Sequence, residues 1–196
     1  MKLSPFSFRL ETSETAQIRE VGPGDQWLLK SGFDRLSQQS RAFRFLAAHP
    51  RLSAKELVQF TAPNDEDHFA IGALIQTDGV VTPLAIARYV RLKPGDSLAE
   101  FAETIIDDYQ GLGLGSLMLG VLAKHAVLNG VSKFVALVHE ENARMLGLLR
   151  ELGAVATMDE DTETEFQLPL FEDASRYPET SVGDAFRTAY RLAQMT

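Results

Sequence analysis

The residues best suited to chemistry lie between Leu98 and Gly115. A glycine-rich run from Gln110 to Gly115 separates a segment typical of a strand, 99–106, from one typical of a helix, 116–129. Glycine lets the backbone adopt conformations closed to other residues and approach a ligand closely. A helix N-terminus adds free N–H groups and a partial positive charge. The pattern therefore predicts an anion site that suits a phosphate or pyrophosphate.

The spacing of these glycines excludes two common phosphate motifs. The dinucleotide fingerprint would need glycine or alanine at Ser116 or Met118, depending on the register. The P-loop needs Lys-Ser/Thr after its last glycine, which this sequence lacks. The remaining pattern, Gln-x-x-Gly-x-Gly, resembles the pyrophosphate loop of the GNAT superfamily, the acyl-CoA-dependent N-acyltransferases. A glycine-rich turn without a ligand is the alternative.

The resemblance implies acetyl-CoA as cosubstrate and a set of residues that contact it. The pyrophosphate would lie on the loop backbone, and the pantetheine arm would lie between two strands that splay apart. The implied cofactor contacts are Gln110, Gly111, Leu112, Gly113, Leu114 and Gly115 in the loop, backbone groups of Thr104, Ile105 and Ile106 on the preceding strand, and Asn142.

A second segment, Asn142 to Gly153, follows a predicted strand at 134–138 and is similar to the family's later motif. Asn142 is a good helix N-cap, and Gly153 suits a left-handed helix stop. Apolar side chains form one stripe between them. The segment departs from the family at Leu149, where many members have a tyrosine that protonates the leaving thiolate. The general acid is therefore not identified.

Acetylation of an amine requires a proton acceptor, because an alkyl ammonium has a pKa of about 10. Glu100 lies ten residues before Gln110, where many relatives have a glutamate, and it is the predicted catalytic residue. Glu103 should point to the opposite face of a regular strand. The alternative for Glu100 is an exposed or salt-bridged carboxylate. His68 is a weaker candidate, expected to be a hydrogen-bonded residue at a strand edge.

The composition is that of a globular protein with an acidic surface. The chain has 196 residues, a net charge of −8 and no cysteine. This charge argues against non-specific binding to nucleic acid or an anionic membrane, and would favour cationic acceptors. No apolar run reaches the about 20 residues that span a bilayer. No export signal or metal motif is found. We expect a cytoplasmic protein without a metal.

The order of elements predicts an α+β fold: a mostly antiparallel central sheet flanked by helices, as in the GNAT fold. Residues 1–15 are expected to be irregular, and a first strand covers 16–21. Asp25 should cap a helix, and Ser53 and Glu56 form a capping box. Three antiparallel strands then precede the glycine loop. Two final strands, 154–158 and 164–168, flank an acidic turn at 159–161.

Two segments bear on the acceptor and on assembly. The run from Phe33 to Phe45 resembles the front helices of bacterial protein-lysine acetyltransferases and would wall the acceptor site, unless Arg41 and Arg44 are only solvated positions. Residues 1–169 form the predicted N-acetyltransferase domain, and 170–196 an extension with one helix. That helix should bury Val182, Phe186 and Tyr190 against its own domain, with a homodimer contact as the alternative.

The sequence thus predicts an acetyl-CoA-dependent N-acetyltransferase that acts on an amine, either a protein lysine or a small amine. The alternative is a non-catalytic acyl-CoA-binding module that senses or regulates. An acceptor cleft blocked by the acidic loop 62–67 or by the C-terminal helix would favour the module. Neither the acceptor nor the preferred acyl-chain length follows from the sequence.

Overall fold

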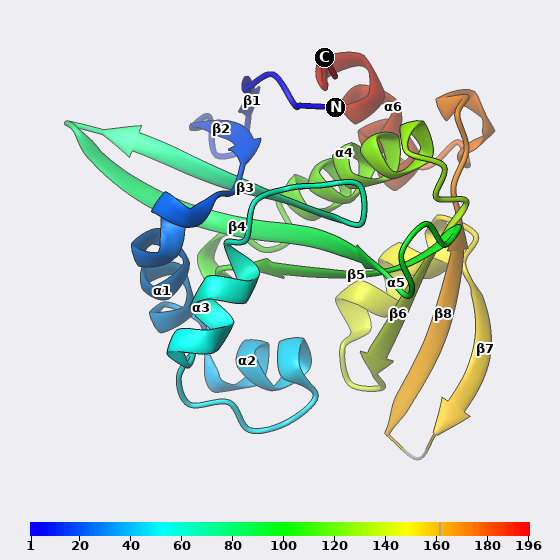
Figure 1. The fold of residues 1–196 in the computed structure, drawn as a ribbon, viewed down its shortest axis with the longest axis horizontal. Coiled ribbons are helices and arrows are strands. Elements are labelled where there is room, and N and C mark those ends of the chain that lie inside the picture. Colours follow the sequence, from blue (N-terminus) through cyan, green and yellow to red (C-terminus); the bar gives the residue numbers. More distant parts are fainter. Residues whose placement is uncertain (161) are drawn as a thin grey trace.

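The computed structural model describes residues 1–160 and 162–196, and within them the chain forms one mixed sheet of eight strands (Figure 1). The strands are β1 (Phe6–Arg9), β2 (Thr15–Glu20), β3 (His68–Thr77), β4 (Val80–Arg91), β5 (Leu98–Ile105), β6 (Lys133–His139), β7 (Val155–Glu160) and β8 (Glu163–Pro169). They lie in the order β1-β2-β3-β4-β5-β6-β8-β7. Strands β5 and β6 run parallel, and the other neighbours are antiparallel. The predicted mixed, mostly antiparallel fold is confirmed.

Helices cover both faces of the sheet. They are α1 (Gln26–Asp34), α2 (Gln38–Phe45), α3 (Ala54–Phe60), α4 (Leu114–Leu128), α5 (Ala143–Glu151) and α6 (Ser181–Leu192). Helices α1, α2 and α3 lie on one face, which we call the front face (Figure 1). Helices α4 and α5 cover the back face, and α6 packs on the outer side of α4.

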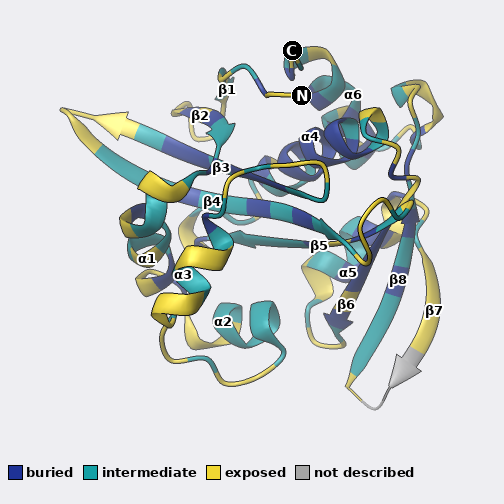
Figure 2. Ribbon diagram, viewed as in Figure 1, coloured by how far each residue is buried: buried dark blue, intermediate teal, exposed yellow. Residues whose placement is uncertain are grey.

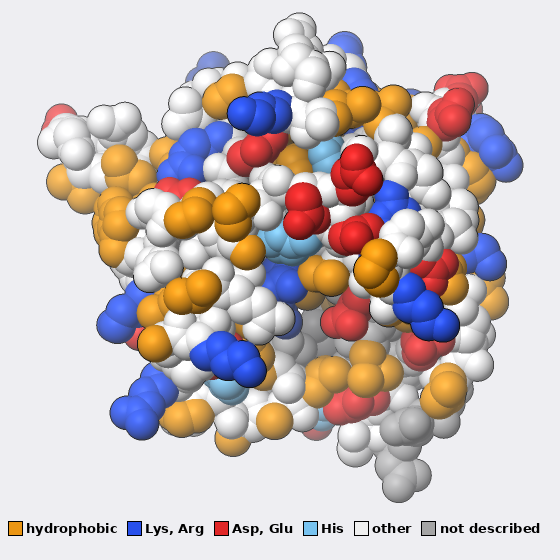
Figure 3. Space-filling model, viewed as in Figure 1, with side chains coloured by type: hydrophobic (Ala, Val, Ile, Leu, Met, Phe, Trp, Pro, Cys, Tyr) orange, Lys and Arg blue, Asp and Glu red, His pale blue; other side chains and the backbone are white. Residues whose placement is uncertain are grey.

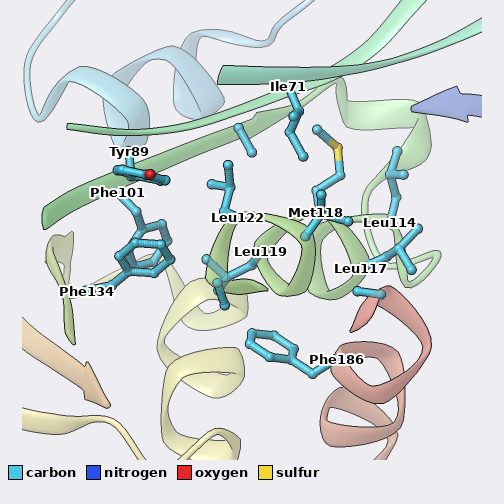
Figure 4. Close-up of a cluster of buried hydrophobic side chains, with 14 of the residues drawn as sticks. Ile71, Tyr89, Phe101, Leu114, Leu117, Met118, Leu119, Leu122, Phe134 and Phe186 are labelled. Carbon is cyan, nitrogen blue, oxygen red and sulfur yellow. The ribbon is translucent and has the colours of Figure 1, made fainter. Parts of the chain in front are cut away.

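The hydrophobic core lies between the back face and α4 (Figures 2 and 4). Alternate strand residues supply an aromatic row, and ring centroids lie 6.1 Å apart for Phe69 and Tyr89 and 5.5 Å apart for Phe101 and Phe134. Helix α4 is apolar on nearly all sides because it is enclosed by the sheet and α6. At Gly120 a Cβ would lie 2.8 Å from the Cβ of Ala189, so the two helices need a glycine at their closest approach.

Strands β5 and β6 pair for only part of their length. Residues 98–100 of β5 pair in order with residues 133–135 of β6, and the pairing then stops. Strand β5 continues to Ile105 beside β4, while β6 continues to His139 beside β8. Beyond Glu100 the two strands therefore separate, and the start of α4 lies at the wide end of this splay.

The two chain ends differ in how well the sequence describes them. The expectation that residues 1–15 are irregular is wrong at Phe6–Arg9, where Phe6 and Phe8 pack against the core and form β1. At the other end α6 forms as expected: Phe186 is fully buried, whereas Val182 and Tyr190 are half-buried. The helix packs on α4 of its own chain.

Smaller differences occur at helix starts and turns. Asp25 occupies the N-cap position of α1 as expected, but its side chain makes no cap hydrogen bond to the helix. Its carboxylate instead binds the guanidinium of Arg19 at 2.6 Å and the N–H of Gly22 at 2.9 Å. The capping box is confirmed: the N–H of Ser53 donates to Glu56 Oε2 at 2.7 Å. Asp159 and Glu160 belong to β7, and the rest of the predicted acidic turn, Asp161, lies outside the described residues.

Candidate active site

The glycine loop presents main-chain donors at the start of α4. Gly111 and Gly113 have φ values of +78° and +76°, which are accessible to glycine at little cost. Helix α4 begins at Leu114, two residues earlier than predicted, because Gly113 is its N-cap. Gly113 has no side chain that could cap the helix, and among the described residues no side chain is hydrogen-bonded to the first-turn N–H groups, so these groups are free for an anion. A 15-residue helix adds its dipole at this point.

Gly115 has a different role, because its φ is not in the left-handed region. A Cβ at this position would lie 3.0 Å from Glu103 Oε2 and 3.0 Å from Ile105 Cδ1. The first turn of α4 therefore lies directly against β5, and only a residue without a side chain fits without displacing its neighbours. This contact places the N–H groups of the loop at the open end of the splay.

The side chain of Gln110 holds the loop in place. Its Nε2 donates to the carbonyl oxygen of Ile105 at 2.9 Å and to Ser40 Oγ at 3.2 Å, and its Oε1 accepts from Arg144 Nη1. One amide thus joins β5, α2 and α5. The backbone N–H of Gln110 also donates to the carbonyl of Asp107 at 3.2 Å, so the free donors of the loop begin after Gln110, and its own contact with a ligand stays a prediction.

Asp107 makes a second connection between the loop and α2. Its carboxylate accepts from Ser37 N at 3.0 Å, Ser37 Oγ at 2.7 Å and Ser40 Oγ at 2.9 Å. Burial raises the pKa of Asp107, but these hydrogen bonds outweigh it and the pKa lies below its ordinary value. The helix that starts at Gln38 is therefore attached to the segment that leads into the glycine loop.

The backbone of β5 decides which peptide groups face the splay. The carbonyl of Leu98 accepts from Leu92 N, and Ile106 N donates to the carbonyl of Leu84 at 2.9 Å, so even-numbered residues bond to β4. The peptide groups of Phe101, Glu103 and Ile105 point the other way, into the splay. The expectation for Thr104 and Ile106 therefore needs correction, since their backbone groups turn toward β4. The peptide groups of Ile105 are on the side of the splay, but its carbonyl already accepts from Gln110 Nε2, and its contact with a cofactor stays a prediction.

Glu100 lies on the front face beside the start of the splay. It stands opposite Val90 on β4 and Val135 on β6, and its side chain is exposed. Glu103 stands opposite Ala87 and points to the back face, under the first turn of α4. Its Oε1 is buried and has no hydrogen-bond partner among the described residues, and burial raises its pKa well above the ordinary value.

A groove runs along the front face between the sheet and the three front helices. Leucine and phenylalanine side chains from α1, α2 and α3 form one wall, and strand residues including Ala102 and Thr104 form its floor. In the view of Figure 3, the surface is hollowed between the front helices and the β5–β6 region, with basic and acidic side chains at the hollow. Residues 62–67 and α6 contribute nothing to the lining of this groove.

Arg44 and Arg88 lie at this groove and share an aromatic neighbour. The Cζ atoms of Arg44 and Arg88 lie 5.6 Å and 4.8 Å from the ring centroid of Phe60. Burial and the charge of Arg88 lower the pKa of Arg44 to about 10, and burial lowers the pKa of Arg88. Arg41 donates to the carbonyls of Pro50 and Asp34. Neither Arg41 nor Arg44 is a freely solvated helix position.

Three of the four histidines, His68, His125 and His139, take different positions. His68 lies on the front face in the same row as Val90 and Glu100, and neither of its ring nitrogens has a hydrogen-bond partner among the described residues. Burial, and next the charge of Arg88, lower its pKa, and the nearby backbone of Pro63 opposes this shift. The contact with Pro63 does not meet the geometry of a hydrogen bond, so the expectation of a hydrogen-bonded histidine stays a prediction. The ring centroid of His139 lies 5.6 Å from that of Phe43 on α2, whereas His125 is buried in the core.

The second predicted motif forms the far side of the splay. Asn142 caps α5, since Met145 N donates to its Oδ1 at 3.2 Å. Leu149 is completely buried in the core, so its position supplies no acid to a leaving group. Among the described residues, no group of three or more His, Cys, Asp or Glu side chains is arranged to bind a metal ion.

Comparison with known proteins now decides the family. The sequence profile of the acetyltransferase (GNAT) family matches residues 34–154, more than half of the chain. The chain belongs to the GNAT acetyltransferase family. The matched range contains α2, α3, the splay, the glycine loop and Asn142, so the family assignment rests on many of the same elements as the site.

Several GNAT relatives align over most of this chain. Acetyltransferase Pat of Mycolicibacterium smegmatis is 31% identical over 195 residues, which cover 96% of this chain and 57% of that protein. Acetyltransferase PA5475 of Pseudomonas aeruginosa is 31% identical over 80% of this chain and 83% of its own length. The crystal structure of the GNAT domain of S. lividans PAT superposes with a TM-score of 0.76, at 28% identity, over 85% of this chain and 97% of that domain. The chain thus spans little more than half of the Mycolicibacterium protein.

Some features of the GNAT site were not apparent from the sequence. Arg88 and Phe60 come from a strand and a helix with no motif of their own, and only the fold brings them to Arg44. The splay-facing backbone of Phe101 and Glu103 depends on the pairing register of β5. No described helix is long and apolar enough to cross a bilayer.

Proposed function

We propose that this chain transfers an acetyl group from acetyl-CoA to the nitrogen of an amine. The proposal rests on the position of Glu100, which lies where β5 and β6 separate, on the face of the sheet that holds the groove. The uncapped N–H groups of α4 lie at the other end of the splay. A cofactor site and an acceptor site then meet at one carboxylate.

The residues at the splay fit acetyl-CoA. The free N–H groups between Gly111 and Ser116 would hold the pyrophosphate, and the splay-facing peptide groups of β5 would flank the pantetheine arm. Asn142 and α5 form the opposite side. When bound, acetyl-CoA supplies the acyl group as a thioester. The named acetyltransferase relatives support this cosubstrate, and the loop leaves donors unused that suit it.

Glu100 has the role of proton acceptor in this proposal. The ammonium group of the acceptor must lose a proton, either to Glu100 directly or to a water that it holds, before its nitrogen lone pair can attack. The new C–N bond then forms as the C–S bond breaks. A thiol with a pKa of about 8.5 is a good leaving group as the thiolate, so a general acid at Leu149 is not needed.

The acceptor in this proposal is an amine, and a protein lysine is the leading candidate. The support is the resemblance of the Phe33–Phe45 segment to protein-lysine acetyltransferases, together with a groove that Arg44 and Phe45 help to line. The groove is also free of the acidic loop and of α6, either of which would have favoured a sensor module.

An acceptor screen tests the proposal. The chain is incubated with acetyl-CoA and with candidate small amines, lysine peptides and proteins, and free thiol is measured together with the mass of the product. Thiol release that depends on an amine, with a matching acetyl mass on that amine, is the expected result. Binding of acetyl-CoA without transfer to any amine class would indicate the sensor module instead. Absence of both binding and transfer would overturn both functions.

A further inference from the structure

We propose that Arg44 and Arg88 form a carboxylate-binding subsite, so that the preferred acceptor has a carboxylate close to the amine that is acetylated. The inference rests on the proposed N-acetyltransferase function and names its substrate class. The carboxylate would belong to an amino acid or to an acidic residue beside a lysine in a peptide.

The first argument is that two cations are brought together where neither forms an ion pair with a described residue. Arg44 comes from α2 and Arg88 from β4, and both guanidinium groups lie over the ring of Phe60. Each charge raises the electrostatic cost of the other, and partial burial adds to that cost. Proteins seldom keep such a pair unless an opposite charge joins it.

The second argument is that their hydrogen-bond donors are not used. Arg88 Nη1 is buried and has no partner among the described residues, which also provide no hydrogen bond or ion pair to Arg44. Two other partly buried arginines are engaged: Arg19 binds Asp25, and Arg91 binds Asp67. A buried donor without a partner is unfavourable, and the planar guanidinium fork matches a carboxylate.

The third argument is the position of this pair relative to Glu100. The negative charge of Glu100 favours the protonated forms of Arg44 and Arg88, yet it forms no ion pair with either. Arg88 stands opposite Ala102, two residues along the same face from Glu100, which makes Arg88 and Glu100 diagonal neighbours about 7 Å apart. An ammonium at Glu100 and a carboxylate at the arginines would therefore be separated by only a few bonds.

Matched acceptors test the subsite. One arm compares amino acids with their amides, which keep the amine and lack the negative charge. The other compares lysine peptides that have Asp or Glu beside the lysine with the same peptides containing Asn or Gln. We expect kcat/KM to be about 10- to 100-fold higher for the carboxylate form in one arm, as for a charge-assisted hydrogen-bonded pair. The arm that shows this preference identifies the source of the carboxylate.

Two variants connect the preference to the arginines. Arg44→Gln and Arg88→Gln should reduce the ratio between carboxylate and amide forms to near one, because kcat/KM for the carboxylate form should fall more than kcat/KM for the amide form. Arg150→Gln, on the exposed side of α5, is the matched control and should keep the ratio. Each variant is first checked for a melting-temperature shift with acetyl-CoA, which reports an intact fold and cofactor site.

The outcomes separate the subsite from the function. A wild-type ratio near one, or variants that lower turnover of both forms equally, overturns the subsite and leaves the acetyltransferase intact. If no amine is acetylated, the proposed function fails, and malonate decides the subsite. Malonate should then raise the melting temperature of the wild type above that in chloride of equal ionic strength, but not that of Arg88→Gln. No malonate-specific shift overturns the subsite as well.

Discussion

Glu100 and Glu103 lie three residues apart on β5 and point to opposite faces of the sheet. The pairing of this strand with β4 shows no register shift, so the alternation of side chains is regular. Glu100 is exposed beside the splay, while the carboxyl of Glu103 is enclosed beneath α4. Two groups of the same chemistry are therefore placed in opposite environments within one strand.

Glu100→Gln tests the proton acceptor. Removal of a general base lowers turnover by about 10²- to 10⁴-fold, and much of the lost rate should return at high pH, where more of the amine is already neutral. Affinity for CoA should change little. Initial rates of thiol release across a pH series are the measurement. Glu103→Gln is the control, and a severe loss there with near-normal Glu100→Gln would transfer the role to the other carboxylate.

Glu103 should also make stability depend on pH. Because the pKa of Glu103 is raised in the folded protein, the folded state keeps a proton that the unfolded state releases above a pKa of about 4.3. The contribution of this group to the free energy of unfolding therefore falls as pH rises from that value toward the folded pKa. Glu103→Gln removes the effect.

Denaturant unfolding of wild type and Glu103→Gln at about pH 4 and pH 7 measures this difference. The variant should gain stability relative to the wild type on going to pH 7. A constant difference between the two proteins across this range would mean that the Glu103 carboxyl is solvated in the folded state.

The glycine loop predicts how cofactor affinity responds to added side chains. Acetyl-CoA should raise the melting temperature of the wild type by mass action. Gly113→Val strains a backbone with φ of +76°, and Gly115→Val forces a side chain against Glu103 and Ile105, so both should abolish the shift. Thermal unfolding with and without millimolar acetyl-CoA is the measurement.

A matched control for this loop lies in the β3–β4 hairpin. Gly79 has φ of +79° and open space around its Cβ position, much as Gly113 has. Gly79→Val should lower the melting temperature through similar backbone strain and keep the acetyl-CoA shift. If Gly79→Val also lost the acetyl-CoA shift, backbone strain far from the loop would be enough to abolish it, and the result for Gly113→Val would not locate the cofactor at the glycine loop.

Helix α6 should contribute to the stability of the whole domain. Phe186 is fully buried against α4, and its ring lies 4.6 Å from that of Tyr177. Phe186→Ala should therefore lower the free energy of unfolding by about 3–5 kcal/mol. Arg191→Ala, at an exposed position of the same helix, should have little effect. A Phe186→Ala protein as stable as the wild type, or rapid proteolysis of α6 from an intact domain, would contradict this packing.

The sequence reveals the parts of the fold that depend on local chemistry. The positive φ of Gly113, the cap at Asn142 and the capping box at Ser53 each require particular residue types at fixed spacing, so they can be recognised in one dimension. Strand β1 was not predicted because it has only four residues and two inward phenylalanines. This alternation of apolar and polar residues is too short to stand out in a polar segment.

The missing parts of the site depend on tertiary placement. Arg44, Phe60 and Arg88 meet only because α2 and α3 fold over the front face, and no spacing in the sequence encodes that contact. Which peptide groups of β5 face the splay depends on the pairing register with β4. A shift of one residue would turn the other set of peptide groups toward the splay.

The donors at the start of α4 are peptide N–H groups, and this affects how the site can be regulated. A peptide N–H does not lose its proton in the physiological range, and no side chain shares the cap with it. An anion held there keeps the same partner from acidic to basic solution, and only its own ionisation changes. Apart from the ionisation of the anion itself, control of binding by acidity or by modification of a side chain must therefore act through the residues that hold the loop in place, such as Gln110 and Asp107.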